Sequence, residues 1–165
     1  MNPGEQICAP VGEHKIVFKG ELGIVIGKTC KAIGEADAEG YVFGYTRAND
    51  VTAANIFNLD PTFARWMRAK GFDTFCPFSP TIASGLDATK LRVKTMLNGQ
   101  VRQHYPISDM RFSVARLVSS LFNDMTLLPG DVILCGTSIG VGSMKPGSTV
   151  EIEIEGIGTL RNTFN

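Results

Sequence analysis

Long apolar runs are missing from this chain, because Gly, Lys or Glu interrupts every hydrophobic stretch well short of the roughly 20 residues that a membrane-spanning helix needs. Residues 1–4 lack the basic and apolar regions of a secretory signal peptide. Both absences argue against a membrane protein and predict a cytoplasmic location.

Net charge is missing as well, because 16 Lys and Arg residues balance 16 Asp and Glu residues. The sequence contains no basic run, so it lacks the positive patch with which proteins bind nucleic acids. We therefore expect the partner to be a small molecule or another protein subunit.

Cysteine and histidine are scarce, and His14 and His104 are the two histidines. The cysteines show no C-x-x-C spacing, which argues against a zinc site and predicts reduced thiols in or near the core. A nucleophilic Cys76 is the less favoured interpretation, because no histidine lies near it in the sequence. The four cysteines are Cys8, Cys30, Cys76 and Cys135.

The composition is that of an ordinary globular domain, with 165 residues, 44% hydrophobic and 19% charged, which suffices to bury a substantial core. No internal repeat, low-complexity segment or linker divides the sequence. We therefore predict one domain over residues 1–165.

Strand patterns dominate the chain. Apolar residues recur at every second position between His14 and Lys28, which predicts one strand, or two strands that meet near Gly20. The alternating segment Leu91–Met96 is followed by the turn signal Asn98-Gly99, so a hairpin is expected there. Further strands are predicted at 41–47, 132–135 and 150–155, the last with one buried face and one wet face.

Helices are predicted to be few and short. The acidic segment Glu35–Glu39 is a helix candidate, because negative charge is favourable at a helix N-terminus. Ser108 is expected to cap a longer helix, whose apolar stripe between Phe112 and Leu121 packs on the sheet. Residues 52–67 contain Pro61 and are predicted to form a surface loop with short helical turns.

The neighbouring residues Lys19 and Glu21 open the most apolar of the predicted strands. Side chains alternate between the faces of a strand, so both are expected on the face opposite Leu22, Ile24 and Ile26. A carboxylate held there could be a metal ligand, and a lysine beside it could instead neutralise it. The pattern of residues leaves both alternatives open.

Several segments in fixed order carry a resemblance to the fumarylacetoacetate hydrolase family, over nearly the whole chain. It implies an α+β fold, predominantly β, which is a mixed β-sandwich roll with a few short helices. It also implies a homodimer and divalent-metal chemistry on small 2-oxo or 2-hydroxy-dienoic diacids, as in the catabolism of aromatic compounds. The segments are Glu21–Lys28, Gly44–Thr46, Asn49–Val51, Ala69–Pro77, Leu128–Asp131 and Gly136–Gly142.

The resemblance also implies roles for individual residues. Glu21 and Asp50 match two of the family's three metal ligands, for magnesium or otherwise manganese or calcium, and Lys19 stands in the place of the third. An ammonium has no lone pair, and its charge repels a cation. Lys70 matches an active-site lysine that binds a substrate carboxylate or stabilises an enolate as it forms. Gly136 and Thr137 match a loop that contacts the substrate carboxylate.

Two hypotheses follow from the resemblance and from the departures from it. The first is an enzyme that forms an enolate and so isomerises, decarboxylates or hydrolyses its substrate. The second is a degenerate relative that keeps the fold and the dimer without catalysis, because Lys19 replaces a glutamate and Ala54-Asn55 replaces an Arg-Asp pair. The chain is also expected to lack the family's N-terminal segment, whose His-Glu pair activates water in the hydrolases.

Overall fold

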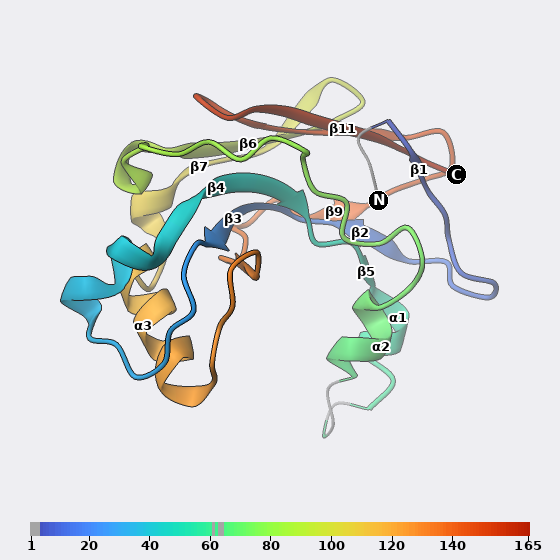
Figure 1. The fold of residues 1–165 in the computed structure, drawn as a ribbon. Helices are drawn as coiled ribbons and strands as arrows, with labels where there is room; N and C mark the ends of the chain where they lie inside the picture. Colours follow the sequence, from blue (N-terminus) through green and yellow to red (C-terminus); the bar gives the residue numbers. More distant parts are fainter. Residues whose placement is uncertain (1–3, 61, 63–64) are drawn as a thin grey trace.

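A computed structural model describes residues 4–60, 62 and 65–165 as a set of three β-sheets with a few short helices (Figure 1). The largest sheet has five strands, and its pairs are antiparallel except for the outermost pair, β1 with β11, which is parallel. In spatial order its strands are β1 (Gln6–Ile7), β11 (Gly158–Phe164), β10 (Thr149–Ile154), β6 (Arg92–Leu97) and β7 (Gln100–Pro106).

Two three-stranded sheets complete the β-structure, and Figure 1 shows the sheet with β3 and β4 lying beneath the five-stranded sheet. This layered arrangement is the predominantly β, sandwich-like α+β fold that the sequence predicted. One sheet has the order β5 (Thr52–Ala53), β2 (Ile16–Phe18), β9 (Gly142–Ser143), and the other β4 (Val42–Asn49), β3 (Gly20–Ile26), β8 (Val132–Leu134).

The hydrophobic core lies between these layers. Every residue of β3 is buried, because β3 is the central strand of its own sheet and also packs against the five-stranded sheet. Strand β10 alternates as predicted, with Val150, Ile152 and Ile154 buried between half-buried glutamates. The two predicted strands that meet near Gly20 are confirmed as β2 and β3, which belong to different sheets.

Helical segments sit at the margins of the sheets. The acidic segment forms the 3₁₀-helix η1. Helix α3 packs on η1, with Ser119 bonded to the Ile33 carbonyl and Phe122 in contact with the ring of Tyr41. Among the described residues, no helix is both long and apolar enough to cross a membrane. The bounds are η1 (Glu35–Tyr41), α1 (Ala54–Phe57), α2 (Trp66–Lys70), η2 (Ala88–Lys90), η3 (Ile107–Asp109) and α3 (Val114–Asp124).

The predicted start of the long helix was wrong. Ser113 caps α3, since its hydroxyl accepts a hydrogen bond from the Arg116 amide, whereas Ser108 lies inside the short 3₁₀-helix η3. Phe112 is therefore outside the helix and half exposed. The stripe of α3 packs mainly on η1 rather than on a sheet.

Three further expectations need correction. Thr52 and Ala53 form the buried strand β5, so the predicted surface loop begins inside the structure; Pro61, within that loop, lies outside the described residues. The edge strand β1 and its neighbour β11 were not predicted from the sequence. Cys8 is exposed, although all four thiols are free as expected.

At Gly20 the chain passes from the three-stranded sheet of β2 into that of β3. Gly20 also packs against the five-stranded sheet. A Cβ atom added at Gly20 would lie 2.0 Å from Oγ1 of Thr95 and 3.3 Å from Cγ1 of Ile152. Only a glycine allows the backbone to approach β6 and β10 this closely. The next residue, Glu21, is thereby fixed deep in the molecule.

Candidate functional site

Strand pairing brings Lys19 and Asp50 together. Strands β3 and β4 are antiparallel with Gly20 opposite Asn49, so the residue before β3 faces the residue after β4. Two backbone contacts fix this junction: the Asp50 amide donates to the Lys19 carbonyl at 2.9 Å, and the Lys19 amide donates to Oδ1 of Asn49 at 3.0 Å. The resemblance implied that Lys19 and Asp50 lie close together, but it did not predict a direct ion pair between them.

Two ammonium groups converge on one carboxylate oxygen. Nζ of Lys19 lies 2.9 Å from Oδ2 of Asp50 and 2.5 Å from Oγ1 of Thr52. Lys70, the last residue of α2, donates to the same Oδ2 of Asp50 and lies over the ring of Trp66, 5.3 Å from its centroid. Asp50 itself is buried, with 5% of its surface exposed.

Glu21 is the second buried carboxyl of the site. Burial, and after it the neighbouring charge of Asp50, raise its pKa to about 7, against the opposing effects of the Gly136 amide and of Lys70 and Lys19. Its Oε2 accepts a hydrogen bond of 2.9 Å from the Gly136 amide. Among the described residues, no ammonium lies within ion-pair distance of Glu21.

The Gly136-Thr137 loop is tied to the start of β3. Gly136 has a φ of +87°, which favours glycine at this turn. The Thr137 hydroxyl donates to the Gly20 carbonyl at 2.9 Å and accepts from Nε2 of Gln103 at 2.8 Å. Because a hydroxyl has a single proton, this side chain is committed to the fold, and only the backbone of Thr137 is available to a carboxylate.

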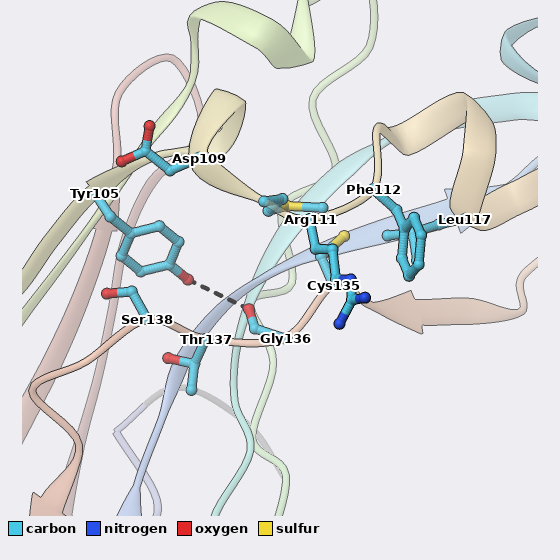
Figure 2. Close-up of a pocket in the computed structure, with 10 residues that line it drawn as sticks. Tyr105, Asp109, Arg111, Phe112, Leu117, Cys135, Gly136, Thr137 and Ser138 are labelled. Carbon is cyan, nitrogen blue, oxygen red and sulfur yellow. Dashed lines mark hydrogen bonds between the residues drawn. The ribbon is translucent and has the colours of Figure 1, made fainter.

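Gln103 and Tyr105 also hold the start of β3 in place, and neither was predicted from the sequence as part of the site. Oε1 of Gln103 accepts from the Gly20 amide at 3.1 Å, and the Tyr105 hydroxyl lies 2.9 Å from the Gly20 carbonyl. The same hydroxyl lies 3.4 Å from the Gly136 carbonyl (Figure 2). Both are buried at alternate positions of β7. A glutamine at a core-facing position of a strand was the available signal.

Two hollows flank the site. One, of about 490 Å³, opens beside Lys19 and Thr52 and has an apolar wall of Phe57 and Trp66, whose rings make an edge-to-face contact at 4.1 Å. The other, of about 270 Å³, lies between the Gly136-Thr137 loop and the segment before α3 (Figure 2). Of these two hollows, only the one of about 490 Å³ is lined by Lys19, and neither is lined by Lys70.

The donor set does not fit a divalent cation as it is folded. Magnesium and manganese require several oxygen ligands, and Oδ2 of Asp50 is already bound by Lys19 and Lys70. Even with both carboxylates ionised, the two ammonium groups leave the cluster without surplus negative charge. Within the described part of the chain, no three His, Cys, Asp or Glu side chains gather in a possible metal site. Metal ligation by Glu21 and Asp50 stays a prediction.

The free thiols should differ strongly in reactivity. Burial raises the pKa of Cys76 to about 11 and that of Cys135 to about 12, and it also raises the pKa of Cys30. Since the thiolate is the nucleophile, these three should react slowly with Ellman's reagent at neutral pH, whereas the exposed Cys8 should react fast.

The measurement is a time course of thiol labelling in the native and the urea-unfolded protein. Cys8→Ser should remove the fast phase and leave the slow phase unchanged. A fast phase that persists in this variant would show that one of the other thiols is accessible and ionised.

Comparison with known proteins gives a consistent family. The model of the fumarylacetoacetate (FAA) hydrolase C-terminal domain matches residues 1–165. The 5-carboxymethyl-2-hydroxymuconate delta-isomerase structure from Mycobacterium smegmatis has a TM-score of 0.94 at 45% identity, over 99% of this chain and 64% of that chain. The oxaloacetate tautomerase YisK of Bacillus subtilis is 39% identical over 155 residues, 88% of this chain and 50% of that protein.

A third relative is a fumarylpyruvate hydrolase from Pseudomonas aeruginosa, whose structure is a complex with Mn²⁺ and pyruvate. It has a TM-score of 0.92 at 27% identity, over 99% of this chain and 72% of that chain. The chain thus spans between half and three quarters of the lengths of these relatives.

Proposed function

Because this chain belongs to the fumarylacetoacetate hydrolase family, we propose that it is an enzyme that acts on a small 2-oxo or 2-hydroxy-dienoic diacid through an enolate. Isomerisation between the enol and keto forms is the reaction that we favour. Two relatives are named as an isomerase and a tautomerase, which supports this choice.

One observation carries the proposal: the ammonium groups of Lys19 and Lys70 converge on the buried Asp50, and their charges also act on the buried carboxyl of Glu21. An enolate carries its negative charge on oxygen, and fixed positive groups in a partly buried site stabilise such a charge as it forms. Glu21, which no ammonium binds in the described structure, is the carboxyl that can exchange a proton with the substrate carbon. The backbone of the Gly136-Thr137 loop would orient a substrate carboxylate.

Hydrolysis is less favoured because it requires a group that activates water. His14 and His104 are both exposed, and His104 accepts a hydrogen bond from Arg92 on the surface of the hairpin at 3.4 Å. Isomerisation needs only the removal and return of a proton, which a single carboxyl can perform. Decarboxylation would use the same enolate and is therefore the second product to measure.

The test is to follow the ketonisation of enol-oxaloacetate by its ultraviolet absorbance, with release of pyruvate measured in parallel. The purified protein should accelerate ketonisation above the buffer rate. An acylpyruvate serves as the substrate for hydrolysis. No acceleration with any of these compounds, in the absence or presence of Mg²⁺ or Mn²⁺, would overturn the proposal.

The alternative is a relative that keeps the fold without catalysis, and the ion-paired Lys19-Asp50-Lys70 cluster favours it, because such a cluster also stabilises a fold. The same assays decide between the two functions, since turnover contradicts this alternative. A homodimer remains a prediction in either case and is checked by light scattering on the eluted protein.

A further inference from the structure

We infer that the ammonium of Lys19 takes the place of a divalent cation in this site, so that the site binds its 2-oxo acid without a metal ion. The absence of metal binding rests on the geometry of Lys19, Lys70 and Asp50 and not on the proposed function. The binding of the acid rests on the proposed function.

The Lys19 ammonium is held in place from several sides. Its Nζ contacts Oδ2 of Asp50 at 2.9 Å and Oγ1 of Thr52 at 2.5 Å. Its own backbone is fixed by Asn49 and Asp50, as described above, so the side chain starts from a rigid position. The side chain is 18% exposed. Lys19 is therefore held in a fixed position within the site and is not a solvated surface residue.

A metal ion would compete with this arrangement at a large cost. It would have to bind the Asp50 carboxylate, whose Oδ2 both Lys19 and Lys70 contact, so two positive charges would lie beside the ion. Charges of like sign repel each other strongly at the short distances of a partly buried site, and a divalent ion doubles the repulsion that a single charge would feel. This repulsion removes useful metal affinity while Lys19 stays in place.

The ammonium keeps one donor for a ligand. Of its three N–H groups, Asp50 and Thr52 take two in the described structure, and Lys19 lines the hollow beside it. The exposed Lys15 lies in the same wall, and Phe57 and Trp66 form the apolar side. This combination suits a small acid whose oxygen atoms face Lys19 and whose unsaturated carbon chain lies on the aromatic rings.

The metal part is tested by titrating metal-free protein with Mn²⁺, using calorimetry and the electron paramagnetic resonance signal of the free ion. The wild-type protein should show no saturable binding at millimolar Mn²⁺. Lys19→Glu places a third carboxylate beside Glu21 and Asp50 and should bind Mn²⁺ about tenfold or more tighter than wild type. Lys15→Glu is the matched control, with the same charge change on the same wall, and should not gain this affinity.

Two results would overturn the metal part: saturable Mn²⁺ binding to the wild type that Asp50→Asn abolishes, or equal affinities of Lys19→Glu and Lys15→Glu. If Lys19→Glu does not fold, as judged by circular dichroism, Lys19→Gln takes its place, because it removes the positive charge without adding a negative one. A gain over wild type is again expected, and no gain contradicts the inference.

The ligand part is tested with pyruvate in the presence of a chelator. Wild-type protein should bind pyruvate, and Lys19→Gln should bind it about tenfold more weakly. Lys90→Gln, which removes a positive charge from the exposed η2 and does not line this hollow, should bind it as well as wild type. Pyruvate binding that requires added Mn²⁺ would overturn the inference but leave the proposed function standing. Absence of pyruvate binding, together with the expected Mn²⁺ results, would instead count against the proposed function.

Discussion

Replacing Lys70 with alanine is expected to lower the rate of enol-oxaloacetate ketonisation by about a thousandfold, because a fixed charge at a developing oxyanion contributes a factor of this order. Lys70 contacts Asp50 and lies on Trp66, so α2 presents its ammonium to the site in one defined position. The measurement is kcat and KM of the purified variant.

A matched control separates this effect from the loss of a positive charge in general. Lys90→Ala removes the same group from the exposed end of η2, where the lysine pairs only with the exposed Asp87 in the described structure, and its rate should equal that of wild type. Lys70→Arg keeps the charge and should retain more activity than Lys70→Ala. If Lys70→Ala keeps wild-type kcat, Lys70 does not stabilise the enolate.

Replacing Gly20 with alanine is expected to lower the free energy of unfolding by about 3 kcal/mol, the upper range for forcing an extra carbon into a packed core. The new Cβ atom would lie 2.0 Å from Oγ1 of Thr95, which is fully buried. Gly20 also exchanges hydrogen bonds with Gln103 and Thr137, so the site would be displaced too. Urea unfolding followed by circular dichroism measures the change.

A second substitution tests the cause. Thr95→Ala removes the clashing hydroxyl, which has no hydrogen-bond partner within the described structure, so the double variant should recover much of the lost stability. Gly40→Ala, where no atom lies within 4 Å of the added carbon, should change stability little. Simple additivity of Gly20→Ala and Thr95→Ala would show that the clash with Thr95 is not the cause.

The sequence predicted the fold through its local patterns. Alternation revealed β10, and Asn98-Gly99 revealed the β6–β7 hairpin, because these signals depend only on near neighbours in the chain. The true helix cap was less clear, since Ser108 and Ser113 both precede apolar residues. Strands β1 and β5 have two residues each, too few for any periodicity to be visible.

Most residues of the candidate site could be predicted, but the contacts among them could not. Glu21, Asp50 and Lys70 do come together, and the resemblance supplied that group. That Lys19 reaches the same oxygen of Asp50 as Lys70 depends on the register of β3 against β4, which no single segment of sequence encodes. The support from Gln103 and Tyr105 depends likewise on the packing of β7 against the Gly20 region.

The strand order of the five-stranded sheet also has a consequence for the growing polypeptide. Its central strand, β10, pairs with β6 on one side and with β11 on the other, yet it is synthesised after most of the other strands. On the ribosome, the β6–β7 hairpin must therefore wait with an unpaired edge until β10 emerges. Conditions that slow translation between α3 and β10 should lengthen this interval and increase misfolding of the nascent chain.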